Sequence, residues 1–360
     1  MMANIVLGGL AAIGLFTGML WLPTLPALAS LHHASDADLS TYAAFGFFVM
    51  DLVLVSELSR YNVLYEAKLS RKALDQTHKN LQASMRYADG LRNLLLHAPE
   101  SKQMLQGCIQ YFNQPMANVS GDFFYTRFRE GRLYLVMADC TGHGVPGAFL
   151  SGVGICYLDE ALDSARLTGP AQILDFLRTK FAKRTAYTEA GIEPLQDGME
   201  CAIVCLDFNL QTVEVASSYL DIGLVADGAW VQVRGNRYPL TPHPTAQKPF
   251  TETRFSLLAV DRILLWTDGM YNQYSATGQK LLRRHFLRQV AYGAAKPQPS
   301  QTLYTELTSF WHAWRGGEPP VDDASLAVCD IATMRQKYAN MAAAGQPSEL
   351  AALQLSAELH

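Results

Sequence analysis

The distribution of apolar and charged positions sets the first part of the chain apart from the rest. No Asp, Glu, Lys or Arg occurs in residues 1–35, and the apolar run at 5–31 exceeds the ~20 residues that a helix needs to cross a bilayer. A second apolar run, 39–56, contains one charged residue, Asp51. We therefore expect residues 1–58 to form a membrane anchor with two transmembrane helices.

The charges that follow the second run predict the orientation of this anchor. Arg60, Lys68, Arg71 and Lys72 lie just after it, and the positive-inside rule then places the remainder of the chain in the cytoplasm. The alternative is a signal peptide, because P-A-L-A-S at 26–30 resembles a cleavage site. No positively charged segment precedes that site, however, and the second run would still remain as a span.

Residues 59–98 have the pattern of a long helical linker. A weak heptad repeat of apolar residues runs through them: Ala67, Leu74, Leu81, Ala88 and Leu95. Arg71, His78 and Arg92 interrupt the complementary position of the repeat. The pattern is consistent with a dimeric coiled coil or with an amphipathic helix that packs on the following domain.

From residue 99 to 332 the pattern changes to short apolar strands separated by helices. The predicted strands are 132–138, 200–208, 212–217, 222–226, 230–234, 262–266 and 325–331. The predicted helices are 146–165, 170–184, 279–292 and 300–314. Because strands and helices do not alternate regularly, we expect an α+β domain with helices packed outside antiparallel sheets. The tail, 333–360, is predicted to be helical or disordered.

Composition excludes some functions. The formal net charge of -4 provides no electrostatic footprint for nucleic acid. The six cysteines lack a paired zinc spacing, so we interpret them as buried thiols in a reducing cytosol.

Acidic residues at the ends of predicted strands are the strongest chemical signal. Asp122, Asp139 and Asp268 each lie beside a glycine-containing turn, and Asp322 and Asp323 precede the last strand. A single such residue is usually a turn or cap residue, but this set predicts a metal site. Oxygen-only ligands suit Mg²⁺ or Mn²⁺. Two such ions about 3.5–4 Å apart can activate water against a phosphate ester.

Four motifs then resemble a known family. They are S-G-D-F at 120–123, A-D-C-T-G-H-G at 138–144, L-W-T-D-G at 265–269 and V-D-D-A-S at 321–325. In order and spacing they resemble the metal-dependent protein phosphatases (PPM, protein phosphatase 2C-like), in their bacterial SpoIIE-type branch, over residues 118–331. Segments 197–208 and 310–319 resemble its membrane-anchored SiaA-like members. The resemblance implies a two-layer antiparallel β-sandwich flanked by helices.

The resemblance also implies roles for individual residues. Asp122 and Asp139 match the bridging metal ligands, and Cys140 matches the position that lends a backbone carbonyl. Asp268 and Asp322 match the remaining ligands of two or more Mn²⁺ or Mg²⁺ ions. Asp323 would orient its neighbour or support a further ion.

The implied reaction is hydrolysis of phosphoserine or phosphothreonine without a covalent intermediate. The implied partner is a small regulatory protein, often of the STAS type that antagonises anti-sigma factors. The implied location is the bacterial inner membrane, with the phosphatase domain in the cytoplasm and a homodimer formed through the linker helix.

Two further features have open interpretations. His143 would donate a proton to the leaving serine oxygen, because the pKa of histidine suits that work, or it is a turn residue that hydrogen-bonds its loop. Segment 145–164 would be a switch helix that controls metal occupancy, or an ordinary core helix.

The sequence departs from the family pattern at 217–221, where S-S-Y-L-D replaces an N-A-G-H-like turn, and at 241–249, which lacks a glycine-rich segment. No basic cluster is evident as a phosphate clamp. Two other functions remain open: a catalytically silent module that binds a partner, and a hydrolase of a small phosphorylated molecule.

Overall fold

A computed structural model of the chain describes residues 34–95, 105–185, 198–241 and 248–343. The chain divides into two units, 1–82 and 83–360. The first predicted membrane span and the last part of the predicted tail, 344–360, lie outside the described residues. The predicted domain boundaries at 58, 98 and 332 stay predictions.

The first unit is dominated by one long helix. Helix α3, Ala34–Leu95, is continuous over 62 residues and includes both the second apolar run and most of the predicted linker. Within the described part of the chain, no helix has a stretch long and apolar enough to cross a membrane. The heptad residues Leu74 and Leu81 are 68% and 52% exposed, so an apolar seam is open to solvent in the single chain. The membrane anchor and the coiled-coil dimer both stay predictions.

The second unit is built on two five-stranded antiparallel sheets. The strands of the first sheet, in spatial order, are β2 (Phe123–Arg129), β3 (Arg132–Cys140), β4 (Met199–Asp207), β5 (Thr212–Ser218) and β8 (Thr253–Ser256). The strands of the second are β1 (Ile109–Gln114), β10 (Ala324–Asp330), β9 (Val260–Trp266), β6 (Ile222–Ala226) and β7 (Ala229–Val233). The predicted α+β class with antiparallel sheets is confirmed.

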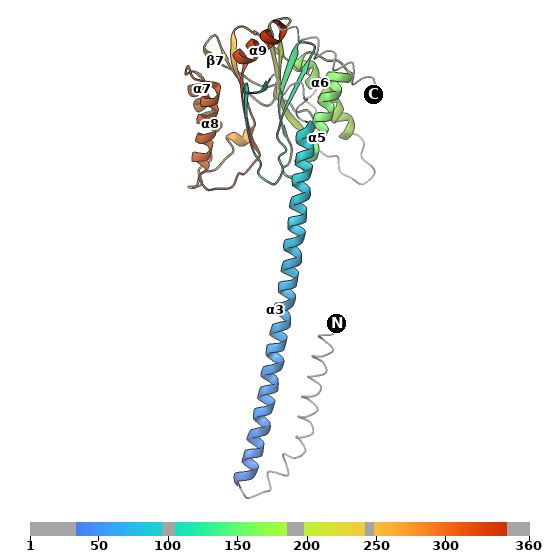
Figure 1. The fold of residues 1–360 in the computed structure, drawn as a ribbon, viewed down its shortest axis with the longest axis vertical. Helices are drawn as coiled ribbons and strands as arrows, with labels where there is room; N and C mark the ends of the chain where they lie inside the picture. Colours follow the sequence, from blue (N-terminus) through green and yellow to red (C-terminus); the bar gives the residue numbers. More distant parts are fainter. Residues whose placement is uncertain (1–33, 96–104, 186–197, 242–247, 344–360) are drawn as a thin grey trace. The chain divides into compact units, whose positions relative to one another are not determined.

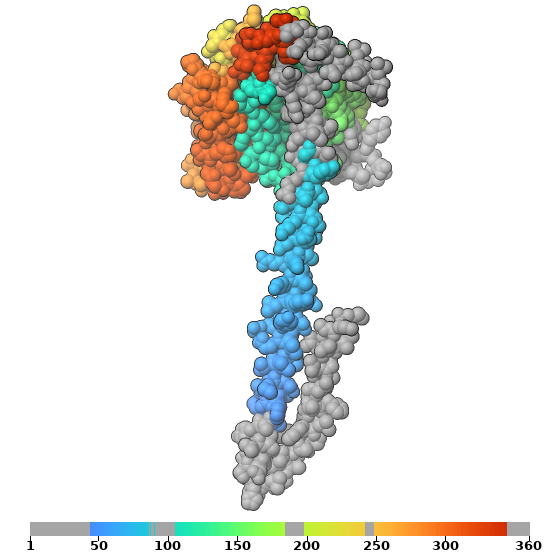
Figure 2. All heavy atoms as spheres, viewed as in Figure 1, coloured from blue at the N-terminus to red at the C-terminus, as the bar shows by residue number. Residues whose placement is uncertain are grey.

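Helices cover the outer face of each sheet. Helices α5 (Val145–Asp159) and α6 (Pro170–Thr185) lie on one side, and α7 (Arg283–Ala294) and α8 (Ser300–Arg315) lie on the other (Figure 1). Figure 2 shows α7 and α8, in orange, forming one outer surface of this unit. A π-helical turn, η2 (Glu160–Ser164), extends α5, and α9 (Ile331–Ala343) follows the last strand.

Three apolar cores result from this layering. Alternate residues of β3 serve different cores: Leu133 and Leu135 face the space between the sheets, whereas Tyr134 and Val136 pack under α5 and α6. The third core lies between the second sheet and α7 and α8. Because β3 is buried on both faces, its apolar residues form a continuous run rather than an alternating pattern.

The observed elements differ from the predicted ones in a few places. Strands β1, β2 and β8 were not predicted, because β1 (I-Q-Y-F-N-Q) and β8 (T-R-F-S) are polar strands at the sheet edges and β2 ends in arginines. Helix α7 begins at Arg283 rather than at 279 because the preceding residues fold back, with a bridge between Tyr274 and Lys280. The other predicted strands and helices are confirmed within a few residues.

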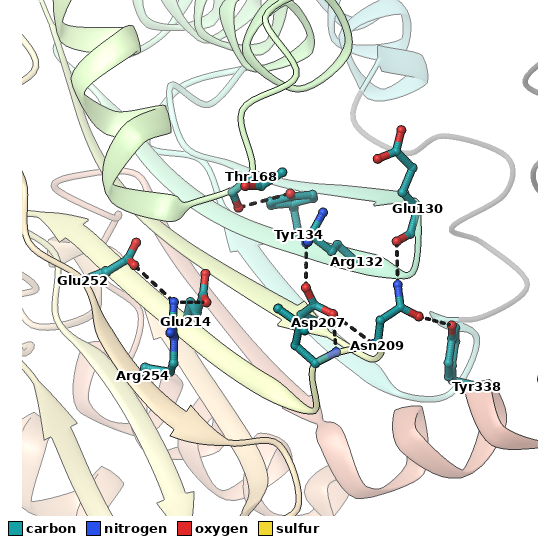
Figure 3. Close-up of polar contacts among 11 residues, drawn as sticks. Glu130, Arg132, Tyr134, Thr168, Asp207, Asn209, Glu214, Glu252, Arg254 and Tyr338 are labelled. Atoms are coloured by element: carbon teal, nitrogen blue, oxygen red, sulfur yellow. Dashed lines mark hydrogen bonds and ion pairs between the residues drawn. The ribbon is translucent and has the colours of Figure 1, made fainter.

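A polar network holds one end of the first sheet (Figure 3). Asp207, which is 2% exposed, accepts a 2.7 Å hydrogen bond from Arg132 Nε and two more from the backbone amides of Asn209 and Leu210. The side-chain amide of Asn209 donates a hydrogen bond to the backbone carbonyl of Glu130. This bond joins the β2–β3 turn to the β4–β5 turn. Arg132 begins β3 and Asp139 lies at its other end, so this network sets the strand register on which the acidic residues depend.

Candidate functional site

The acidic motifs meet at one end of the two sheets. Asp122 precedes β2, whose first residue, Phe123, pairs with Ala138 beside Asp139. Asp268 follows β9 and Asp322 precedes β10, and the ends of these two strands are paired in the same way. Each sheet therefore contributes two carboxyl groups from the ends of neighbouring strands.

Thr267 connects the two sheets at this end. Its hydroxyl donates a 2.7 Å hydrogen bond to Asp122 Oδ2 and accepts one of 2.9 Å from the Ser325 backbone amide. The Thr267 amide in turn donates to the Ser325 carbonyl. All three residues are fully buried. A charge-assisted hydrogen bond in a dry environment orients a carboxylate strongly, so Thr267 sets the direction of Asp122.

Asp139 and Asp268 lie close enough for each carboxyl group to affect the pKa of the other. Burial raises the pKa of Asp139 well above its usual range, and the carboxyls of Asp122 and Asp268 raise it further. Burial also raises the pKa of Asp268, while a 2.6 Å hydrogen bond from Asn272 opposes the shift. Two carboxyl groups close together disfavour each other's ionised form, and a cation between them would offset this repulsion.

This donor set fits a hard divalent cation by its chemistry. The converging groups are carboxyl oxygens, which Mg²⁺ and Mn²⁺ prefer, and their mutual repulsion is what a cation would offset. Among the residues that the structure describes, however, no three His, Cys, Asp or Glu side chains stand close enough to hold one ion.

The Cys140 carbonyl and the following turn are packed tightly against the Asp122 loop. A Cβ atom added to Gly121 would lie 3.1 Å from the Cys140 carbonyl oxygen and 2.9 Å from that of Gly142. A Cβ on Gly147, in the first turn of α5, would lie 2.3 Å from the Gly142 oxygen. The predicted carbonyl position thus lies beside the loop that carries Asp122, and only glycine permits this approach.

His143, in this turn, lies near Asp322. His143 is exposed, yet it is close enough to Asp322 to lower the pKa of that carboxyl. Burial is the larger effect, and with Asp268 nearby it raises the pKa of Asp322 to about 6. The structure therefore brings His143 to the acidic end, as the sequence predicted.

Asp323 is engaged by the backbone. It is 4% exposed, and its two oxygens accept hydrogen bonds of 2.7 Å from the amides of Met116 and Gly121. The loop from β1 to β2 is thereby held against the start of β10, and the loop ends in Asp122. The Asp323 side chain therefore orients the loop that carries Asp122, and its predicted roles toward Asp322 or a further ion stay predictions.

Glu200 is a further carboxyl that the sequence reasoning missed. It lies on β4 directly opposite Asp139, and burial together with Asp268 raises its pKa to about 7, although Arg237 opposes the shift. In the sequence, the only indication of a role for Glu200 is that it is a single acidic residue at the start of an otherwise apolar predicted strand. Without the strand register, nothing linked it to Asp139.

The raised pKa values of Asp322 and Glu200 make the metal-free protein sensitive to pH. Their ordinary values are 3.8 and 4.5, so the folded state retains protons that the unfolded state loses. The free energy of unfolding therefore falls as the pH rises from about 4 through about 7. A bound cation would offset this loss, and its effect would be largest above that window.

We expect Asp323→Asn and Asp322→Asn to differ in a thermal unfolding experiment. Asp323→Asn places an NH₂ group against a backbone amide, which should lower the free energy of unfolding by about 1–3 kcal/mol. For a domain of this size, each kcal/mol lost lowers the melting temperature by roughly 2–4 °C. Added Mn²⁺ should still stabilise this variant at about pH 7.5, because the predicted ligands are all retained.

The matched variant, Asp322→Asn, removes a predicted ligand with fewer structural contacts. It should unfold near the wild-type temperature without metal and lose most of the stabilisation by Mn²⁺. If Asp323→Asn were instead the variant that kept its stability and lost the response to Mn²⁺, Asp323 would be a ligand rather than a structural support.

The sequence and the fold are similar to those of known proteins. A family model described as stage II sporulation protein E (SpoIIE) matches residues 129–332. The SiaA-PP2C domain of Pseudomonas aeruginosa is similar in structure, with 19% sequence identity and a TM-score of 0.59 over 71% of this chain and 98% of that domain. A structure of SpoIIE from Bacillus subtilis, containing its PP2C phosphatase domain and a fragment of its regulatory domain, covers 62% of this chain and 61% of its own, with 13% identity and a TM-score of 0.48. No curated protein sequence matches this chain significantly.

Proposed function

This chain belongs to the SpoIIE family of PP2C-type serine/threonine protein phosphatases, and we propose that it hydrolyses phosphoserine or phosphothreonine on a small regulatory protein. The family match covers more than half of the chain. The proposed substrate is of the STAS or anti-sigma-antagonist type, and the proposed setting is signalling at the bacterial inner membrane. The structure of the acidic end is the basis for the chemistry.

The observation that supports this function best is the convergence of carboxyl groups from both sheets. Asp122 and Asp139 lie at paired strand ends of the first sheet, and Asp268 and Asp322 lie at paired strand ends of the second. Thr267 joins the two ends by its hydrogen bond to Asp122. We propose that Asp122, Asp139, Asp268 and Asp322, with the Cys140 carbonyl, hold the metal ions. When bound, two such ions supply an acidified water molecule and charge stabilisation for the phosphoryl oxygens.

The residues of the chain have distinct tasks in this proposal. Thr267 keeps Asp122 directed into the site, and Asp323 holds the loop that ends in Asp122. His143, exposed and near Asp322, donates a proton to the serine oxygen as the phosphate ester breaks.

We propose that the N-terminal region regulates this site. A signal at the membrane would alter the dimeric arrangement of the linker and reach the acidic end through α5, whose first turn packs against the Asp122 loop at Gly147. The exposed apolar seam on α3 supports a dimer. Removing residues 1–56 should therefore change both phosphatase activity and the oligomeric state measured by light scattering. A truncated protein that behaved as the full chain in both measurements would contradict this regulation.

Phosphate release by the full-length protein tests the function itself. The substrates are a phosphoserine peptide and an aryl phosphate, each assayed with Mn²⁺, with Mg²⁺ and with a chelator. Release that requires the metal and favours the peptide would support a protein phosphatase. Release from small phosphorylated molecules alone would favour the hydrolase alternative. A folded protein that binds Mn²⁺ but releases no phosphate from any substrate, including a phosphorylated STAS-type protein, would favour the silent module.

A further inference from the structure

An exposed arginine lies beside the acidic end of the first sheet. The backbone around Arg237 runs along the end of β5, where Ser218 forms a parallel bridge with Asn236. Tyr219 donates a 2.9 Å hydrogen bond to the Asn236 carbonyl, and the Ser218 hydroxyl donates one of 2.9 Å to the Tyr238 carbonyl. Arg237 is therefore fixed between two anchored residues, while its side chain is exposed.

The strand register places Arg237 at the same end as the carboxyl groups. Ser218 pairs with Cys201 of β4, and the preceding residue, Glu200, pairs with Asp139 of β3. Arg237 is close enough to Glu200 to lower the pKa of its carboxyl. The backbone at Arg237 thus lies beside the acidic end, on the side of the first sheet.

A lysine has the equivalent position beside the second sheet. The segment after Asp268 folds back on itself, with a bridge between Tyr274 and Lys280 and a 2.8 Å hydrogen bond from the Leu281 amide to the Gln273 carbonyl. Lys280 is exposed, and the segment that folds back begins beside Asp268, because the side-chain amide of Asn272 donates a 2.6 Å hydrogen bond to that carboxyl group.

These two cations differ from a third one nearby. Arg283 is held in an ion pair with Asp221, which is 3% exposed, so its charge is used within the protein. Within the described part of the chain, no ion pair involves Arg237 or Lys280. An exposed cation that is not held by a carboxylate retains its donors for an anionic ligand, and arginine presents a fork that matches phosphate oxygens.

We propose that Arg237 and Lys280 form a phosphate-recognition pair, one beside each sheet, for the phosphorylated residue of the protein substrate. The inference rests on the proposed function, because it specifies how the same site receives its substrate. The phosphate dianion must approach a centre rich in carboxylates, and border cations both attract it and hold the oxygens that face away from the acids. Neither residue was evident as a clamp in the sequence, since each is isolated there.

The test uses the Mn²⁺-loaded full-length protein and the variants Arg237→Ala, Lys280→Ala and the double variant. Arg288→Ala is the matched control, because Arg288 is an exposed arginine on α7 outside the site. Each single variant should raise KM for a phosphoserine peptide about tenfold, the size of one lost charge-assisted hydrogen bond, with kcat little changed. Inhibition by inorganic phosphate should weaken by a similar factor, and Arg237→Lys should restore part of the affinity.

Two readouts separate this role from others. The stabilisation of the protein by Mn²⁺ should be unchanged in all variants, because neither cation binds the metal. Unchanged KM and unchanged phosphate inhibition in the variants of an active enzyme would overturn the inference, as would a fall in kcat accompanied by loss of the Mn²⁺ response. If Arg288→Ala weakened inhibition by inorganic phosphate as much as Arg237→Ala or Lys280→Ala does, the effect would be one of overall charge, and the inference would also be overturned. If the wild-type protein itself releases no phosphate, the proposed function fails and the inference fails with it.

Discussion

Replacing Asp139 with alanine should reduce metal-dependent phosphate release by about 10³-fold or more, equivalent to about 4 kcal/mol of transition-state stabilisation. Among the site carboxyls, Asp139 interacts with the most others: its pKa is raised, after burial, by Asp122, Asp268, Asp322 and Glu200. Removing it takes away a proposed shared ligand, while Asp268 keeps its hydrogen bond from Asn272. The measurement is the initial rate of phosphate release from a phosphoserine peptide over a range of Mn²⁺ concentrations.

The matched control for this experiment is Asp261→Ala, which removes an exposed carboxyl paired only with Arg335. It should retain wild-type activity. Circular dichroism of Asp139→Ala would show that the loss of activity is not a loss of fold. Retention of more than a tenth of the wild-type rate at saturating Mn²⁺ would exclude Asp139 as a bridging ligand.

His143 is tested in the same assay by a different substrate comparison. A proton donor matters most for a poor leaving group, so His143→Ala should slow release from phosphoserine and leave an aryl phosphate with a good leaving group nearly unaffected. Equal rates for wild type and variant on phosphoserine would leave His143 as a turn residue.

Replacing Trp311 with alanine should cause the largest loss of stability, about 3–5 kcal/mol. Trp311 is fully buried in α8, and its ring lies 5.4 Å from that of Phe112 in an edge-on arrangement. Its Nε1 donates a 3.3 Å hydrogen bond to the Gly269 carbonyl. The melting temperature of the protein should fall by roughly 6–20 °C. Activity should fall as well below that temperature, because the turn after Asp268 loses its support.

Trp314→Ala provides the control on the same helix. Trp314 is only half-buried and lies outside the core that contains Trp311. Trp314→Ala should lower the free energy of unfolding much less than Trp311→Ala does, and the turn at Gly269 should be unaffected. Trp311→Phe keeps most of the packing and loses the hydrogen bond, so it should fall between the two alanine variants. Similar melting temperatures for Trp311→Ala and Trp314→Ala would show that the core between the second sheet and α8 is not where this stability arises.

The acidic residues could be found in the sequence because each stands beside a glycine or another acid at the end of an apolar strand. That local signature identified Asp122, Asp139, Asp268 and Asp322, and the structure brings all four to one end of the sheets. It identified Asp323 as well, but not that both of its oxygens are used by backbone amides. Hydrogen bonds between residues about 200 positions apart have no local pattern.

The residues that the sequence could not reveal depend on strand pairing. Glu200 belongs to the site because it lies opposite Asp139 in the paired strands. Thr267 belongs to it because its hydroxyl contacts Asp122 across the two sheets. Arg237 and Lys280 are each surrounded by polar residues in loops, where a charge is ordinary. The edge strands β1 and β8 were missed for a related reason: a strand paired on one side only does not need a continuous apolar pattern.

The contact between Gly121, Gly142 and Gly147 limits how this region can change over evolution. Any other residue at 147 would place its Cβ 2.3 Å from a carbonyl oxygen, and neither partner is a side chain that could move aside. At 152, by contrast, an added Cβ would meet no atom within 4 Å. Substitutions should therefore accumulate on the outer side of α5 while its first turn stays unchanged. Homologues that differ widely in what they recognise could in this way retain the same acidic centre.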